Sequence, residues 1–122
     1  MAKARILIAD DEEGIRESLN LILGEHYDLD FATNGEETLA KLAQGHYALL
    51  LLDIKMPKLD GLEVLKRLST SENSRPPVLM LTAYQSVELA REAIKFGALD
   101  YLPKPFETDQ ILSAVRSALV PR

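Results

Sequence analysis

The chain has no cysteine and no tryptophan, and aromatic side chains make up only 6% of its 122 residues. Without cysteine it can form neither a disulfide framework nor a thiolate metal site, so an intracellular setting is the simplest interpretation. The amino-terminal segment MAKARILIAD has a basic start but too short an apolar run for a signal-peptide core or a membrane span. We therefore expect a cytoplasmic protein with no membrane partner.

Basic residues are in the minority, with 14 lysines and arginines against 19 aspartates and glutamates and a net charge of -5. They are dispersed, whereas phosphate neutralisation needs them clustered, so we expect no direct nucleic-acid binding by this segment. The composition is typical of one compact soluble domain, which we assign to residues 1–119. Residues 120–122, in the terminal LVPR, match what remains after thrombin cleavage of a tag; a native helix end is the alternative.

Short apolar runs alternate with amphipathic stretches along the chain, which is the pattern of βα repeats. The runs predict five strands, at Arg5–Ala9, Leu29–Ala32, Leu49–Leu52, Val78–Leu81 and Ala98–Leu102. Each is followed by apolar residues at helical spacing, which predicts five helices. Right-handed crossovers leave few topologies for such a chain. We expect an α/β fold with a doubly wound parallel sheet in the flavodoxin-like order 2-1-3-4-5.

Capping signals mark the starts of two predicted helices. Asn34, with Glu37 three residues later, predicts a capped second helix that runs to about Gln44. Ser86 is expected to cap the fourth helix. The apolar residues of the fourth helix that we expect to face the core are Val87, Ala90 and Ile94.

The run Leu49–Leu52 is the stretch around which the chain is organised. It is short, apolar on both faces and ends abruptly on Asp53, which is typical of a central parallel strand covered by helices on both sides. Asp53 would then lie at the carboxyl end of that strand. Open α/β sheets bind their ligands at this edge, so Asp53 is the first candidate functional residue.

Polar side chains from four strand ends are expected to meet at that edge. With the first and third strands adjacent, Asp10 and Asp11 would lie beside Asp53, while Thr82 and Lys104 would arrive from the fourth and fifth strands. Three clustered carboxylates repel one another unless a cation joins them, and a hard divalent ion such as Mg²⁺ fits oxygen ligands. With an ammonium and a hydroxyl nearby, the set is suited to orient a phosphoryl group on a carboxylate nucleophile.

Four of these residues, all except Asp53, also have a purely structural interpretation. Taken alone, Asp10 and Asp11 would be interpreted as negative charges that stabilise a helix N-terminus, each by about 0.3–1 kcal/mol. Thr82 alone fits a strand-end residue, and Lys104 between two prolines fits an exposed lysine. Their convergence at one edge favours function, because so many independent coincidences are improbable.

Four motifs follow one another at the strand ends: IADDE, LLLDIKMPKLDG, MLTAY and GALDYLPKPF. In this order and at these spacings they make the chain resemble, over essentially its whole length, the CheY-like receiver domain of bacterial two-component response regulators. The resemblance implies that Asp53 accepts a phosphoryl group from a phosphohistidine on a sensor histidine kinase.

The resemblance also implies a magnesium site. Asp11 and Asp53 would ligate Mg²⁺ together with the backbone carbonyl of Lys55. Asp10 would act on the metal largely through water.

Further roles implied by the resemblance concern the phosphoryl group and the switch. Thr82 and Lys104 would contact the phosphoryl oxygens, and an inward rotation of Tyr101 would accompany activation. The Lys104–Pro105 peptide bond is often cis in such proteins, which would place the ammonium by a tight turn.

The expected function is therefore a phosphorylation-activated switch, and not an enzyme beyond its own phosphoryl transfer and slow autodephosphorylation. The change would pass through the face made by the fourth helix, fifth strand and fifth helix. Its recipient would be an output domain or target protein that is not in this chain, and phosphorylation could produce a dimer.

Two alternative functions remain open at the level of sequence. A degenerate receiver that serves only as an interaction module would usually lack one of the acids, the threonine or the lysine, and all are present. A phosphohydrolase with an aspartyl intermediate would carry an Asp-x-Asp-x-Thr pattern and a cap. Here Asp10 and Asp11 are adjacent, and no cap fits in 122 residues.

Overall fold

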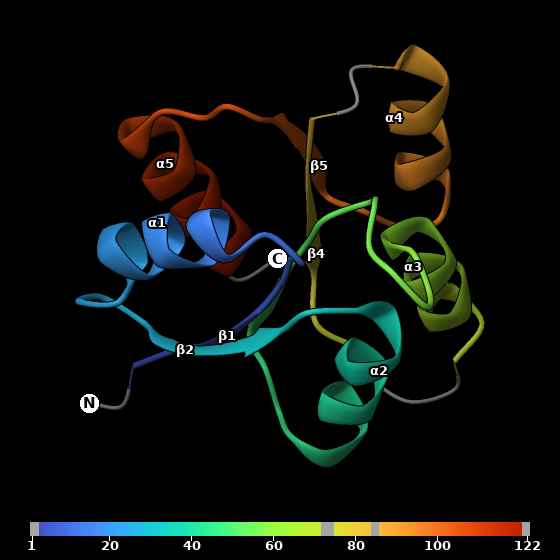
Figure 1. The fold of residues 1–122 in the computed structure, drawn as a ribbon, viewed down its shortest axis with the longest axis horizontal. Helices are drawn as coiled ribbons and strands as arrows, with labels where there is room; N and C mark the ends of the chain where they lie inside the picture. Colours follow the sequence, from blue (N-terminus) through green and yellow to red (C-terminus); the bar gives the residue numbers. More distant parts are fainter. Residues whose placement is uncertain (1–2, 72–74, 84–85, 121–122) are drawn as a thin grey trace.

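The computed structural model describes residues 3–71, 75–83 and 86–120 of the chain. Within these residues, five parallel strands form one sheet in the order β2-β1-β3-β4-β5, and helices flank the sheet on both sides (Figure 1). The strands are β1 Arg5–Ala9, β2 Asp28–Ala32, β3 Leu49–Leu52, β4 Val78–Thr82 and β5 Asp100–Pro103. The predicted fold class and strand order are confirmed, with β2 and β5 at the two edges.

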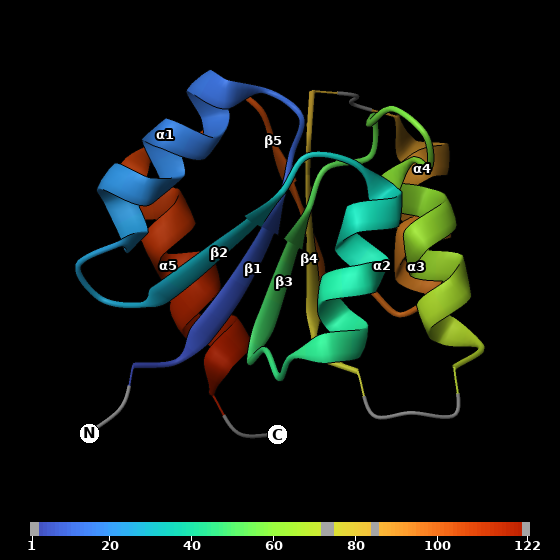
Figure 2. The same cartoon turned by 60° about the horizontal axis from the view of Figure 1, so that its bottom comes forward.

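Five helices of the described residues cover both faces of the sheet. They are α1 Glu13–Leu23, α2 Gly35–Gln44, α3 Gly61–Ser69, α4 Val87–Lys95 and α5 Thr108–Leu119. Helices α1 and α5 lie together on one face, and α2, α3 and α4 lie on the other (Figure 2). In the described part of the chain, none of the helices has the length and apolar character that crossing a bilayer requires.

The leucines of β3 alternate between two cores. Leu50 and Leu52 belong to the cluster that packs against α2, α3 and α4, whereas Leu49 and Leu51 belong to the cluster that packs against α1 and α5. All four are buried, because β3 is central and successive side chains point to opposite faces. Packing on both faces therefore fixes where the next residue, Asp53, lies.

The predicted inward face of α4 is wrong. Val87 is 69% exposed and Ile94 is 50% exposed, and Ala90 is only half-buried. The face against the sheet carries Ala93, which is buried, and Leu89, which packs on the same core. The helix has two overlapping apolar stripes, so helical periodicity alone does not decide which one is covered.

The predicted fifth strand also begins too early. Gly97 has φ +102 and ends the turn after α4, and the amide of Ala98 donates to the carbonyl of Ala93 at 2.9 Å. Ala98 therefore lies in the turn that closes α4, and β5 runs from Asp100 to Pro103.

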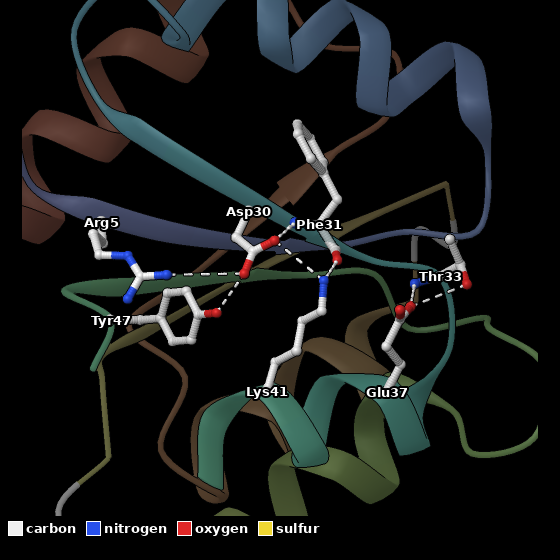
Figure 3. A network of polar contacts seen from close by, with 7 residues as sticks. All are labelled: Arg5, Asp30, Phe31, Thr33, Glu37, Lys41 and Tyr47. Carbon is white, nitrogen blue, oxygen red and sulfur yellow. Dashed lines mark hydrogen bonds and ion pairs between the residues drawn. The ribbon is translucent and has the colours of Figure 1, made fainter. Parts of the chain in front are cut away.

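The two predicted caps are confirmed. Asn34 Oδ1 accepts a hydrogen bond from the Glu37 amide at 2.8 Å, and Ser86 Oγ accepts one from the Leu89 amide at 3.3 Å. The Glu37 carboxylate reaches one residue further back than a capping box requires, because it accepts from the Thr33 amide at 2.6 Å (Figure 3).

A polar network ties the edge strand β2 to α2 and to the segment before β3 (Figure 3). Tyr47 donates its hydroxyl to Asp30 Oδ2 at 2.6 Å, and Lys41 Nζ donates to Asp30 Oδ1 at 3.1 Å. The Arg5 guanidinium lies 4.8 Å from the centre of the Tyr47 ring and 3.9 Å from Asp30 Oδ2. The hydrogen bond from Tyr47 lowers the pKa of Asp30, while burial and the Asp30 carboxylate raise the pKa of Tyr47 to about 12.

Replacing Tyr47 by Phe is expected to lower the free energy of unfolding by about 1 kcal/mol at pH 7, because the half-exposed Asp30 carboxylate loses a charge-assisted hydrogen bond. Because the pKa of Asp30 is lower in the folded state, its carboxylate stabilises the fold at pH values above the ordinary aspartate pKa of 3.8. This contribution is lost as the pH falls through the lowered pKa. Urea unfolding at several pH values should thus show a deficit that shrinks in acid. Tyr27→Phe is the matched control, and a pH-independent deficit in Tyr47→Phe would contradict the account.

Candidate functional site

Four buried polar residues meet at the carboxyl edge of the sheet. Asp10 follows β1, Asp53 follows β3, Thr82 ends β4 and Lys104 follows β5, with exposed fractions of 1%, 4%, 0% and 8%. Backbone bonds that continue the ladder hold them there: the Asp53 amide donates to the Ala9 carbonyl, and the Lys104 amide donates to the Thr82 carbonyl, both at 2.9 Å. The sheet therefore brings together residues that are distant in sequence.

The ammonium of Lys104 lies among carboxylates. Its Nζ is 2.6 Å from Asp10 Oδ2, 3.2 Å from Glu12 Oε1 and 3.5 Å from Asp53 Oδ2. The Lys104–Pro105 bond is cis, as the sequence resemblance implied. One positive charge thus faces two buried carboxylates and a third carboxylate at the surface.

Burial and charge perturb each of these groups. Burial raises the pKa of Asp53 to about 6, the charge of Asp10 adds to the rise, and Lys104 opposes it. Burial also raises the pKa of Asp10 against the opposing effect of Lys104. For Lys104, burial disfavours the charged form, but the closely paired Asp10 carboxylate and the other nearby negative charges prevail and raise its pKa. The ammonium therefore stays protonated at neutral pH.

The acids of this edge can approach one ion. One carboxylate oxygen from each of Asp10, Asp11, Glu12 and Asp53 lies within 4.8 Å of the others, and Asp11 and Glu12 are exposed. Hard oxygen donors with excess negative charge fit a divalent cation such as Mg²⁺. The residues present therefore fit the metal that the sequence predicts.

A cleft of about 410 Å³ opens over this cluster. It is lined by Asp11, Glu12, Asp53, Lys55, Thr82, Ala83 and Lys104. Lys55, whose carbonyl the sequence resemblance assigned to the metal, thus lies at the same opening. The cleft has room for a small anionic group above the Asp53 carboxylate.

The loop after β3 is packed tightly against Asp53. The Gly61 amide donates to the Ile54 carbonyl at 2.6 Å, and a Cβ on Gly61 would lie 1.9 Å from the Asp53 carbonyl oxygen. Asp60 caps α3 by accepting from the Glu63 amide at 2.8 Å. Glycine at position 61 therefore allows the start of α3 to contact the backbone of the strand end.

Tyr101 is not among the residues that line the cleft. It is paired with Met80 in the sheet and packs on the core beneath α4. Its hydroxyl is buried, and burial raises its pKa against the opposing effect of the Ser86 backbone. The side chain is thus held inward by packing.

Glu12 is a site residue for which the sequence alone indicates no role at the site. Its amide donates to Asp10 Oδ1 at 2.9 Å, and the resulting tight turn directs its carboxylate toward Lys104. The sequence signal was an acid two residues after Asp10, which resembles an ordinary acidic helix start.

Comparisons with known proteins give one consistent result. The family model described as "Response regulator receiver domain" matches residues 6–116. The chain is 44% identical over 120 residues to "Uncharacterized transcriptional regulatory protein YkoG" of Bacillus subtilis, covering 98% of this chain and 52% of YkoG. It is 40% identical over 116 residues to "Regulatory protein AtoC" of Escherichia coli, covering 94% of this chain and 25% of AtoC. It therefore spans about half or less of these relatives' length.

Among solved structures, the chain resembles a response regulator receiver domain protein (CheY-like) from Methanospirillum hungatei JF-1. The TM-score is 0.89 at 32% sequence identity, and the match covers 97% of this chain and 94% of the other.

Proposed function

The chain belongs to the response regulator receiver domain family, and from this premise we propose that it is a phosphorylation-controlled switch whose phosphoacceptor is Asp53. Receiver domains are signalling modules of two-component systems and not classical enzymes. The observation that carries the proposal is the buried Asp53 carboxylate, 3.5 Å from the Lys104 ammonium beneath an open polar cleft. A carboxylate in that position can meet a phosphoryl donor from solvent.

The proposed reaction is transfer from a phosphohistidine of a sensor histidine kinase. An Asp53 carboxylate oxygen forms a P–O bond while the P–N bond to the kinase imidazole breaks. The imidazole nitrogen leaves with the electron pair and takes up a proton. With a pKa of about 6, Asp53 is mostly ionised at neutral pH, which is the form that attacks.

The proposed metal ligands are Asp11, Asp53 and the Lys55 carbonyl, with Asp10 acting through water. When bound, Mg²⁺ supplies positive charge for the phosphoryl oxygens. This fits the excess of negative charge in the acidic cluster.

Thr82 and Lys104 are proposed to bind the phosphoryl oxygens of the product. The Thr82 hydroxyl lies at the buried end of β4 and at the cleft, so it can donate to an oxygen placed on Asp53. That hydrogen bond exists only in the phosphorylated state, so it shifts the population toward a second packing. An inward orientation of the Tyr101 side chain is proposed to accompany that second packing.

The proposed output surface is the face made by α4, β5 and α5. Val87 and Ile94 expose apolar area on α4, and a changed packing beneath them would alter what the face presents. An output domain, a target protein or a second phosphorylated copy is the proposed recipient.

The experiment that tests this function exposes the chain to acetyl phosphate with Mg²⁺ or with a chelator and records the intact mass. The expected result is one phosphoryl group per chain with Mg²⁺ and none with the chelator. A chain that never gains mass would support the degenerate interaction module instead. Continuous release of phosphate over many turnovers would support the phosphohydrolase.

Replacing Asp11 by Asn is expected to weaken Mg²⁺ binding by roughly ten-fold or more, because a charged oxygen ligand is lost from the acidic cluster. Isothermal titration calorimetry with Mg²⁺ measures this directly. Asp28→Asn is the control, since Asp28 is the first residue of β2 and lies at the amino end of that strand, whereas the site lies at the carboxyl ends of the strands. Equal Mg²⁺ affinity in Asp11→Asn and the parent would remove Asp11 from the ligand set.

A further inference from the structure

Glu12 makes a contact across the site that no assigned role explains. Its side chain is 60% exposed, yet its Oε1 lies 3.2 Å from the Nζ of Lys104, whose side chain is 7% exposed. The contact joins the start of α1 to the turn after β5, 92 residues apart in sequence. The contact therefore depends on the position of the α1 start relative to the turn after β5.

The backbone around Glu12 is fixed by the buried Asp10. The Glu12 amide donates to Asp10 Oδ1 at 2.9 Å, and Arg16 Nη1 donates to the Asp10 carbonyl at 2.8 Å. Glu12 is the N-cap of α1, but its carboxylate makes no capping hydrogen bond within the described residues of that helix. The carboxylate is directed to Lys104 instead of to the helix end.

Lys104 has a limited number of donors for its partners. An ammonium offers three N–H groups, and the carboxylates around it are Asp10, Glu12 and Asp53 at 2.6, 3.2 and 3.5 Å. A phosphoryl group on Asp53 would add acceptor oxygens on the side where Lys104 makes its longest contact. Of the three carboxylates, only that of Glu12 is exposed, so it is the one released at least cost.

We propose that Glu12 is a positioning residue that holds the Lys104 ammonium in the resting state and competes with a phosphoryl group on Asp53 for it. The inference rests on the proposed function. Glu12 would thereby set how strongly the phosphorylated state is favoured. Because its carboxylate is exposed, removing the charge should favour that state by roughly two- to five-fold.

A metal-directed role for Glu12 predicts the opposite sign. Its carboxylate belongs to the acidic cluster, so a Glu12 that helped to hold Mg²⁺ would, on neutralisation, weaken the metal and every ligand that depends on it. The direction of the change therefore distinguishes restraint of Lys104 from support of the metal.

The test compares Glu12→Gln with Glu13→Gln, which removes the same charge one residue later in the first turn of α1. Beryllofluoride, a mimic of the phosphoryl group, is titrated at saturating Mg²⁺ and followed by fluorine magnetic resonance. We expect Glu12→Gln to bind beryllofluoride roughly two- to five-fold more tightly than the parent and Glu13→Gln to match the parent. Unchanged or weaker binding by Glu12→Gln, or an equal gain in Glu13→Gln, overturns the proposal.

A second arm needs no phosphoryl mimic. In chelator, the nitrogen resonance of the Lys104 ammonium should shift in Glu12→Gln and stay in place in Glu13→Gln. An unmoved resonance overturns the Glu12 contact, whatever beryllofluoride does. If the parent binds no beryllofluoride, the result contradicts the proposed function and, with it, this role of Glu12. If the parent binds beryllofluoride and Glu12→Gln changes nothing, the result rejects only the role of Glu12.

Discussion

Asp53→Asn is expected to abolish phosphoryl acceptance and, without metal, to make the fold more stable. Asparagine keeps the shape of the side chain but has no ionised oxygen to attack phosphorus. It also removes a carboxylate that is 4% exposed and lies beside Asp10. Because burial raises the pKa of Asp53 to about 6, the ionised form costs the fold about 1–3 kcal/mol at pH 7, and the substitution should recover that amount.

The pH dependence of this gain follows from the same pKa. A carboxyl whose pKa is higher in the folded state binds its proton more tightly there, so the stability contribution of Asp53 rises as the pH falls through about 6. The advantage of Asp53→Asn over the parent should therefore shrink below pH 6 in urea unfolding with chelator. Asp28→Asn controls for the loss of a carboxylate. Phosphorylation of Asp53→Asn to the level of the parent, or a less stable variant, would contradict the account.

Lys104→Met is expected to destabilise the fold in chelator by about 3–5 kcal/mol, because it leaves two buried carboxylates without their cation. Methionine keeps most of the aliphatic length, so the change is mainly in charge. Lys104 Nζ lies within 3.5 Å of both Asp10 and Asp53, and those side chains are 1% and 5% exposed. Their mutual repulsion would then be opposed by no buried positive charge from the residues that the structure describes.

Lower pH and a second substitution should each reduce the loss of stability in Lys104→Met. Lower pH protonates Asp10 and Asp53, whose pKa values are already raised and should rise further without the ammonium, so stability should increase toward acid. Neutralising a second charge, as in Lys104→Met combined with Asp53→Asn, should recover part of the loss. Lys3→Met, at an exposed position before β1, is the control. A loss in Lys104→Met that stays constant with pH would show that packing and not charge accounts for it.

The sequence predicted the fold well because its central strand is unambiguous. Leu49–Leu52 is apolar at every position, which is typical of a strand buried on both faces inside a parallel sheet. The strand order then followed from crossover handedness and size. The buried face of α4 was harder to predict, because the helix carries Val87 and Ile94 on one apolar stripe and Leu89 and Ala93 on another. Only packing against the sheet decides which stripe is buried.

The residues that meet at the cleft could be foreseen because backbone topology alone brings them together. Asp53, Thr82 and Lys104 each stand at or just after the carboxyl end of a strand, and parallel strands place such residues at one edge. Glu12 could not be foreseen, since its contact depends on a turn closed by the Asp10 side chain and on the direction of a flexible lysine. The Asp30 network could not be predicted either, because it joins side chains from β2, α2 and the loop before β3.

Asp53 itself is proposed to carry the phosphoryl group. The parent chain, treated with acetyl phosphate and Mg²⁺, can be reduced with borohydride, which converts an aspartyl phosphate to homoserine, and then digested and sequenced by mass spectrometry. We expect homoserine at position 53 and aspartate at positions 10 and 11. Homoserine at any other aspartate, or an unreduced residue 53 in a chain that carries a phosphoryl group, would contradict it.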